Sequence, residues 1–267
     1  MSRIRSWTVT CAGDIPALVV VPETDAKAPV VVVMHERYGF VQHTRDLAER
    51  MARDGYVAIA PDLYFKHPDQ EALHRGDAGY DMTDPDAVVG LNAAIDALKA
   101  VPQADTTRIA VMGTCQTGRH PLVLAAARPI AAALVWYGSA QPREWQVNTK
   151  YPRALEEIIA AVDCPVLGMF GETDHLISVD DIRRFRDCLE RHGKSFRIHI
   201  YRDAPHGWLN DTMPGRYRQA QAEAAWAAQR EFLHMAFAGD YDRATRRQRY
   251  EAGIAADYDF SRNVRHE

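Results

Sequence analysis

Cysteine is scarce in this sequence, and no two cysteines lie close together. The 267 residues include four cysteines, and none belongs to a C-x-x-C pair: Cys11, Cys115, Cys164 and Cys188. A disulfide-bonded scaffold or a zinc ribbon needs a denser and more regular pattern. We therefore expect a reduced protein without a disulfide framework or a metal, in which a thiol is available for chemistry.

Long hydrophobic runs and an excess of positive charge are also missing. The longest apolar run, residues 130–136, has the length of a strand, whereas a membrane-spanning helix needs about 20 apolar residues. The first five residues lead into a polar alternating stretch and not into the apolar core of a signal peptide. Lys and Arg total 32 against 36 for Asp and Glu, a net charge of -4, which argues against nucleic acid or anionic lipid as a partner. We predict a cytoplasmic protein.

The sequence does contain a regular alternation of short β-rich runs with longer helical patterns. A run of valines at 29–34 is typical of a strand buried on both faces, and the turn at Gly13 predicts a hairpin before it. The expected strands are residues 7–11, 15–21, 29–34, 56–60, 108–112, 130–137, 165–170 and 196–201. The expected helices are residues 44–54, 84–100, about 114–127, 153–162, 179–192 and about 215–238.

This order predicts an α/β fold with a mostly parallel central sheet, helices on both faces and an antiparallel N-terminal edge. Residues 61–83 are rich in loop signals, and Asp84 is expected to cap the helix whose first position is Pro85. Functional sites of such sheets lie at the carboxyl ends of the strands. The site is therefore expected among residues 34–39, 113–118, 170–174 and 204–208.

Cys115 stands at a predicted turn from a strand into a helix. The stretch 111–118 reads VMGTCQTG, so small residues flank a potential nucleophile. Such a sharp turn exposes its side chain next to a helix N-terminus, which favours a thiolate. The N–H of Gln116 would then point at the oxyanion of an attacked carbonyl. The alternative is that Cys115 is a small core residue, as most free cysteines are.

A histidine base and an acid are expected downstream of such a nucleophile, in the order nucleophile, acid, histidine. Asp174 follows the strand at 165–170, and His206 follows the last strand after a short loop. One histidine among 11 would be unremarkable by itself, but the joint order favours a triad of Cys115, Asp174 and His206. The nearby Glu172 is a second candidate for the acid.

These segments resemble the dienelactone hydrolase family of the α/β-hydrolases over roughly residues 15–238. The resemblance is carried by GTC at 113–115, GETDH at 171–175, APHGW at 204–208 and HERYG at 35–39. It implies Cys115 as nucleophile, His206 as base and Asp174 as the acid that orients it. It also implies Glu36 as the resting partner of the thiol, and the N–H groups of Arg37 and Gln116 as the oxyanion hole.

Two positions depart from the family pattern. The family's elbow usually reads G-x-C-x-G-G, whereas Thr117 stands here at the first of the two final glycines. The relatives that hydrolyse dienelactone place an arginine four residues after the catalytic histidine to hold the substrate carboxylate, and this position is Asn210 here. The sequence does not name the natural substrate.

Three further side chains are expected near the site and could contact substrate: Tyr38, Arg119 and Trp208. We assign residues 1–239 to the catalytic domain. Residues 240–267 form an extension with six acidic and six basic residues and several aromatics. We expect this extension to dock on its own domain or on a second subunit in a homodimer, with a simple helical extension as the alternative.

Three functions follow from these residues. The first is a cysteine hydrolase of an ester or lactone, with no cofactor, acting through a thioester acyl-enzyme. The second is a noncatalytic small-molecule-binding protein with a degenerate elbow, which the substitution at Thr117 favours. The third is a thiol redox protein, although no other cysteine is close to Cys115 in the sequence. The intact Asp174 and His206 favour the first.

Overall fold

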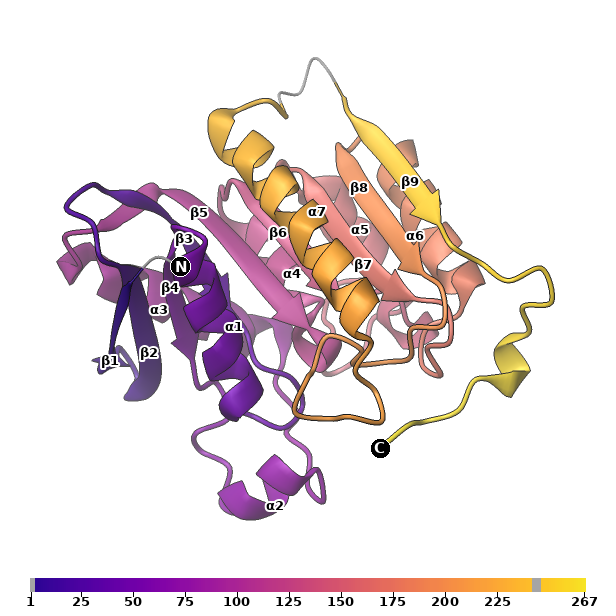
Figure 1. Ribbon diagram of the computed structural model, residues 1–267, viewed down its shortest axis with the longest axis horizontal. Helices are drawn as coiled ribbons and strands as arrows, with labels where there is room; N and C mark the ends of the chain where they lie inside the picture. Colours follow the sequence, from indigo (N-terminus) through magenta and orange to yellow (C-terminus); the bar gives the residue numbers. More distant parts are fainter. Residues whose placement is uncertain (1–2, 242–245) are drawn as a thin grey trace.

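The computed structural model describes residues 3–241 and 246–267, which form one sheet covered by helices on both faces (Figure 1). Its nine strands lie in the order β1-β2-β4-β3-β5-β6-β7-β8-β9. Their bounds are β1 Ile4–Cys11, β2 Ile15–Pro22, β3 Ala28–Val33, β4 Val57–Pro61, β5 Ala104–Thr114, β6 Ala132–Trp136, β7 Val166–Gly171, β8 Phe196–Tyr201 and β9 Gln248–Ala252.

The sheet is parallel except at its N-terminal edge, as the sequence predicts. Strands β1 and β2 form the expected antiparallel hairpin, and β2 pairs antiparallel with β4. The hairpin turn needs two left-handed residues, which Gly13 (φ 77°) and Asp14 (φ 61°) supply. All other neighbouring strands pair in parallel, so their carboxyl ends meet at one edge of the sheet.

Two layers of helices bury the sheet. Helices α1 and α7 lie on one face and α3 to α6 on the other, while α2 stands apart (Figure 1). The bounds are α1 Gln42–Arg53, α2 Gln70–Arg75, α3 Asp84–Ala97, α4 His120–Ala127, α5 Leu155–Ala161, α6 Val179–Arg191 and α7 Gln219–Ala238. Short 3₁₀ helices are η1 Leu98–Ala100, η2 Cys115–Thr117, η3 Pro142–Trp145 and η4 Phe260–Arg262.

The core explains why the valine-rich strand lies in the middle of the sheet. The side chains of valines 30–33 are fully buried, and they alternate between the two apolar clusters on opposite faces. No helix among the residues that the structure describes is long and apolar enough to cross a membrane.

The cap of α3 differs from the prediction. Thr83, not Asp84, is the N-cap, and its hydroxyl accepts a hydrogen bond from the N–H of Asp86, whose carboxylate completes a capping box. Asp84 is buried instead, because its carboxylate forms an ion pair with Arg119. Residues 61–83, expected as loop, contain the short helix α2, which Asp69 caps through the N–H of Ala72.

Several other boundaries also differ from the expected ones. The helix after Gly113 is interrupted: η2 comes first, and α4 begins only at His120, with proline in its first turn, where the missing N–H costs nothing. Helices α5 and α7 begin two and about four residues later than expected. Strand β9 was not expected, and it extends the sheet beyond β8.

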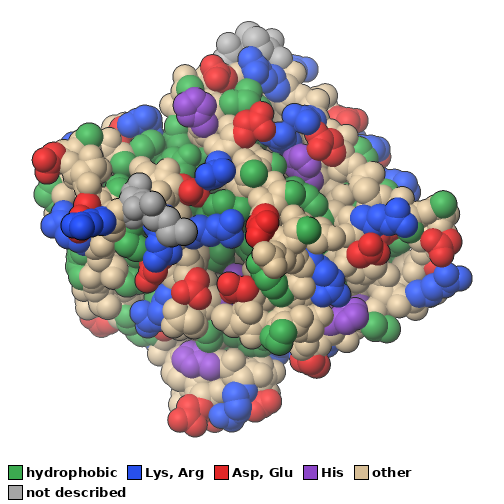
Figure 2. All heavy atoms as spheres, viewed as in Figure 1, with side chains coloured by type: hydrophobic (Ala, Val, Ile, Leu, Met, Phe, Trp, Pro, Cys, Tyr) green, Lys and Arg blue, Asp and Glu red, His purple; other side chains and the backbone are tan. Residues whose placement is uncertain are grey.

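The outer surface carries charges of both signs. On the face in Figure 2, basic and acidic side chains are interspersed, and neither sign gathers into one continuous field. This mixture is consistent with the small net charge of the sequence.

Candidate active site

Strand β5 ends in a tight turn that carries Cys115. Cys115 has a φ of 54°, in the left-handed region, and its side chain is half-buried. The turn can close because its neighbours are glycines: a Cβ on Gly113 would lie 2.4 Å from the carbonyl oxygen of Thr117. A Cβ on Gly118 would lie 2.7 Å from the Cα of Gly138. A strained, accessible cysteine at the end of a central strand is the geometry of a nucleophile elbow.

Thr117 fits this elbow. Its fully buried hydroxyl accepts a hydrogen bond from the N–H of Thr114 at 3.1 Å and donates to the carbonyl oxygen of His35 at 2.9 Å. The hydroxyl of Thr114 donates to the carbonyl oxygen of Met34 at 3.3 Å. These bonds fasten the elbow to the segment that follows β3, while Gly118, one residue later, provides the close approach of the backbone.

The structure brings Cys115, His206 and Asp174 together at the carboxyl edge of the sheet. The Nε2 atom of His206 lies 3.1 Å from the Sγ atom of Cys115, and its Nδ1 atom lies 2.8 Å from Oδ2 of Asp174. The other carboxylate oxygen of Asp174 accepts hydrogen bonds from the N–H groups of Leu176 (2.7 Å) and Ile177 (3.2 Å). The carboxylate is therefore fixed to its own loop, and the imidazole lies between acid and thiol.

The electrostatics of the site favour a charged imidazole. Burial by itself would lower the pKa of His206, but the negative charges of Asp174 and Cys115 and their hydrogen bonds hold this pKa well above its usual value. The neighbouring His175 has its pKa lowered, chiefly by burial. An imidazolium beside a sulfur can form an ion pair with a thiolate, which is the reactive form of cysteine.

Glu172, the second candidate for the acid, has other partners. One of its carboxylate oxygens accepts a hydrogen bond from the N–H of Asp203 at 3.0 Å, and the other accepts one from the N–H of Ala255. It therefore joins the loop before His206 to the C-terminal extension, and does not contact the imidazole ring.

Glu36, expected as the resting partner of the thiol, bonds another side chain in the structure. Its Oε2 atom accepts a hydrogen bond from the side-chain amide of Asn210 at 2.9 Å, and both residues are buried. The pairing follows from Asn210, whose N–H donor reaches the carboxylate while the sulfur faces His206. Burial, followed by the charge of Glu36, raises the pKa of Tyr137 well above its usual value.

The two residues expected to form the oxyanion hole also hold the loop 61–83. The guanidinium of Arg37 donates to the carbonyl oxygens of Gly76 at 3.1 Å and Ala78 at 3.4 Å. The side-chain amide of Gln116 donates to the carbonyl oxygen of Tyr80 at 2.8 Å. Their side chains are thus bonded to this loop, and the oxyanion hole expected from their main-chain N–H groups stays a prediction.

Two of the three expected substrate contacts lie in the interior. Trp208 is fully buried in the apolar cluster beneath α7, 5.5 Å from Trp136 between ring centroids. Tyr38 is 4% exposed, and its hydroxyl accepts a hydrogen bond from Arg216 at 3.0 Å. Both side chains are therefore packing residues, and the ring of Trp208 lies 6.1 Å from that of Tyr137 between centroids.

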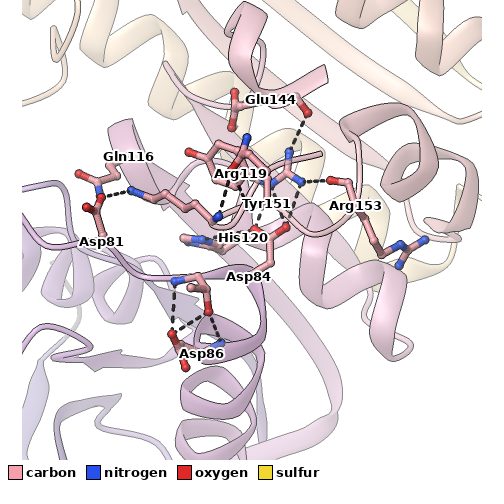
Figure 3. Close-up of polar contacts among 12 residues, drawn as sticks. Asp81, Asp84, Asp86, Gln116, Arg119, His120, Glu144, Tyr151 and Arg153 are labelled. Atoms are coloured by element: carbon pink, nitrogen blue, oxygen red, sulfur yellow. Dashed lines mark hydrogen bonds and ion pairs between the residues drawn. The ribbon is translucent and has the colours of Figure 1, made fainter. Parts of the chain in front are cut away.

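Arg119, expected as a substrate contact, is bonded within the protein. Its guanidinium forms an ion pair with Asp84 at 3.0 Å and donates to the carbonyl oxygens of Glu144 and Arg153 (Figure 3). The side chain is 1% exposed and lies 4.4 Å from the ring centroid of Tyr151. A buried guanidinium must be neutralised, and the carboxylate of Asp84 forms the ion pair that does so.

Three further residues lie beside the site, and the sequence predicts neither Arg216 nor Asn263 there. Tyr137, at the end of β6, has a ring centroid 5.4 Å from that of His206 and a φ of 36°. Arg216 is buried and bonds Tyr38, and Asn263 of the extension bonds the loop of Asp174. Tyr137 is expected there from its place after a central strand. No local signal marks the other two, because their partners are distant in the sequence.

One group outside the site has ligand types that suit a transition metal. Within the described residues, ligand atoms of Glu156, Cys188 and His192 all lie within 4.8 Å of one another. The same Glu156 oxygen lies 2.5 Å from the guanidinium of Arg191, and burial raises the pKa of Cys188 to about 11. An ion pair and a protonated thiol both oppose a metal there.

The sheet order and the elbow in its middle define the class of the protein as α/β-hydrolase. The fold is shared with the acylaminoacyl peptidase of Pyrococcus horikoshii, with a TM-score of 0.67 over 88% of this chain and 42% of that one, at 17% identity. The sequence model of the dienelactone hydrolase family matches residues 15–237. The chain belongs to the dienelactone hydrolase family, and it is a lactone or ester hydrolase.

Individual relatives agree with this assignment. A protein of Methylorubrum extorquens named as a carboxymethylenebutenolidase is 30% identical over 220 residues, 80% of this chain and 74% of its own. One of Salmonella typhimurium with the same name is 30% identical over 235 residues, 82% of each chain. A crystal structure named as a dienelactone hydrolase from Klebsiella pneumoniae has a TM-score of 0.77 at 26% identity, over 88% of this chain and 99% of that one.

Proposed function

We propose that the protein is a cysteine hydrolase that cleaves a carboxylic ester or lactone through a thioester acyl-enzyme. The observation that carries the proposal is the line of contacts from sulfur to imidazole to carboxylate, with distances of 3.1 Å and 2.8 Å. In this arrangement Cys115 is the nucleophile, His206 the base and Asp174 the residue that orients the imidazole. The side chains present complete this chemistry without a cofactor.

The reaction has two stages. In the first, His206 holds the proton of the thiol while the sulfur of Cys115 attacks the carbonyl carbon, and the N–H groups of Arg37 and Gln116 stabilise the oxyanion. The imidazolium then gives its proton to the leaving alkoxide as the carbon–oxygen bond breaks, which leaves a thioester. In the second, His206 takes a proton from water, the hydroxide attacks the thioester, and the thiolate leaves with release of the acid.

The two other functions lose support from the contacts of the site. Thr117, which favours a noncatalytic binding protein in the sequence, makes hydrogen bonds that keep the elbow closed and leaves Cys115 half-buried beside His206. A redox role would need a second thiol near Cys115. In the part of the chain that the structure describes, the three other cysteines are buried and free.

A rapid-mixing experiment tests the proposed function directly. The protein is mixed with a panel of aryl esters and lactones, quenched in acid, digested and analysed by mass spectrometry. We expect turnover, with a transient mass increase equal to the acyl group on the peptide that contains Cys115. Binding of these compounds without turnover on any of them would instead indicate the noncatalytic alternative.

We also expect a preference for neutral substrates over substrates that carry a carboxylate. The position of the family's carboxylate-binding arginine holds Asn210, and its amide is bonded to the buried carboxylate of Glu36. Arg37 and Arg119 are bonded to main-chain carbonyls and Asp84. The missing charge-assisted pair should cost a carboxylate-bearing substrate about 1.5–3 kcal/mol, on the order of 10–150-fold.

Matched substrates measure this preference. One substrate carries a free carboxylate away from the scissile bond, and the other carries its methyl ester; kcat/KM is compared for the two. A higher kcat/KM for the free carboxylate would contradict the inference from Asn210. It would point to Arg216, the buried cation that contacts Tyr38, as the group that binds the charge.

A further inference from the structure

The C-terminal extension lies against the catalytic edge of the sheet. Strand β9 pairs in parallel with β8, the strand that leads to His206, and the chain then crosses to the carboxyl ends of the strands (Figure 1). The family match ends at residue 237, so residues 246–267 lie outside it. Any part that the extension plays in the site is therefore a property of this chain and not one that the family match carries.

Asn263 is the residue of the extension that touches the loop of Asp174. Its side-chain amide donates to the main-chain carbonyl oxygen of Asp174 at 2.9 Å and lies 3.2 Å from the carbonyl oxygen of Glu172. One amide group thus bridges two carbonyls that lie two residues apart in residues 172–178, the acid loop between β7 and α6. Among the described residues, the amide of Asn263 is the one donor that bonds the main-chain carbonyl oxygen of Asp174.

The chain is fastened on both sides of Asn263. On one side, the hydroxyl of Tyr258 accepts a hydrogen bond from the N–H of Val179, at the start of α6, at 3.0 Å. On the other side, the carbonyl oxygen of His266 accepts one from the guanidinium of Arg216 at 2.6 Å. These two anchors fix the place of the amide, so that it can act as a rigid support.

We propose that Asn263 is a positioning residue of the hydrolase, which holds the loop of Asp174 so that the carboxylate stays on the imidazole of His206. The proposal rests on the proposed function. The mechanical link is direct, because Asp174 bonds the N–H groups of Leu176 and Ile177 and its carboxylate must follow any shift of the loop. A loop held at its carbonyls by Asn263 keeps the 2.8 Å contact to His206.

The isosteric variant Asn263→Asp removes the donors and keeps the shape of the side chain. Because a displacement of about 1 Å in a catalytic group can cost on the order of 100-fold, we expect kcat to fall by about 10–100-fold. The KM for the same aryl ester should change by less than about threefold, since the substrate-binding surface is untouched. Asn263→Ala should give a loss of similar size.

The pH profile separates positioning from a general loss of structure. Asp174 and His175 face His206 from the acid loop, Cys115 faces it from the elbow, and Tyr137 from the end of β6. The carboxylate favours the imidazolium, so a carboxylate that moves away lets His206 lose its proton at lower pH. The alkaline limb of kcat/KM should therefore move down by about half a pH unit or more in Asn263→Ala, which removes the donors without adding a carboxylate to the loop.

The matched control is Val264→Ala, at the next residue, whose side chain is 58% exposed. It should keep the wild-type kcat and pH profile. Activities are normalised to the reactive thiol titrated in each sample, so that an unfolded fraction does not lower the apparent kcat. Thermal unfolding of each variant is recorded alongside.

The outcomes distinguish this proposal from the proposed function. A wild-type kcat in both Asn263 variants and an unmoved alkaline limb in Asn263→Ala, with an inactive Cys115→Ala variant, would overturn the role of Asn263 alone. Full activity in Cys115→Ala would overturn the proposed function whatever Asn263 does. A lower kcat with an alkaline limb that stays in place would show that Asn263 does not act through His206, and it would also overturn the proposal.

Discussion

Replacing Cys115 with alanine should lower kcat for an aryl ester by on the order of 10⁴–10⁶, because the covalent route then has no nucleophile. Folding should be nearly unaffected, since the side chain is half-buried at the surface of the elbow and alanine is smaller. The measurement is steady-state hydrolysis together with thermal unfolding of both proteins. Cys11→Ala is the matched control. It should keep the wild-type kcat because Cys11 ends β1, the edge strand of the hairpin, and not one of the strands that lead to the site.

Selective alkylation checks the same residue without a mutation. Burial raises the pKa of the other three thiols, to about 12 for Cys164 and about 11 for Cys188, and also raises that of Cys11. Iodoacetamide reacts with thiolates, so Cys115 should be labelled first and activity should fall in step with its labelling. Full activity in Cys115→Ala, or inactivation that tracks another cysteine, would contradict the assignment of the nucleophile.

The edge of the sheet at which these residues meet could be predicted from the sequence. The βα alternation fixes the strands as parallel, and parallel strands place their carboxyl ends on one side. Cys115, Asp174 and His206 follow β5, β7 and β8, so they are brought to one edge whatever the details of packing. The distances between these side chains could be obtained only from the structure. The two hydrogen bonds join residues that are 32 and 91 positions apart in the chain, and such separations leave no periodic signal in the sequence.

The partners of long polar side chains could not be predicted in the same way. Arg119 lies four residues after the nucleophile, yet it turns to the buried carboxylate of Asp84, 35 positions away. Glu36 likewise bonds Asn210 across 174 positions. In both cases burial decides the pairing, since a charge removed from water takes the nearest neutralising or hydrogen-bonding group.

The C-terminal extension shows a related limit. Its mixed charges and aromatic residues predict that it docks, but the composition does not say where. Strand β9 has the sequence QRYEA. It contains an arginine and a glutamate, so it lacks the apolar run by which the buried strands are predicted. It lies at the open edge of the sheet, where one side of each residue faces water, and polar residues are compatible with an edge strand.

The acid of the triad gives the second large effect. Asp174→Asn should lower kcat by about 10⁴, because an amide cannot hold the imidazole in the tautomer that accepts the proton of the thiol. The KM should change little, since Asp174 is 1% exposed and its carboxylate contacts His206 and its own loop. The charge that helps to raise the pKa of His206 is also lost, so the alkaline limb of kcat/KM should move to lower pH.

Glu172→Gln is the comparison that makes this assignment specific, because Glu172 lies two residues away and is also buried. Its carboxylate accepts hydrogen bonds from the N–H groups of Asp203 and Ala255, and glutamine retains one oxygen that can accept either of them. Its kcat should therefore fall by less than about tenfold, far short of the loss in Asp174→Asn. Equal losses in the two variants would mean that the loop as a whole, and not the carboxylate of Asp174, governs the imidazole. A larger loss in Glu172→Gln would reassign the acid to Glu172.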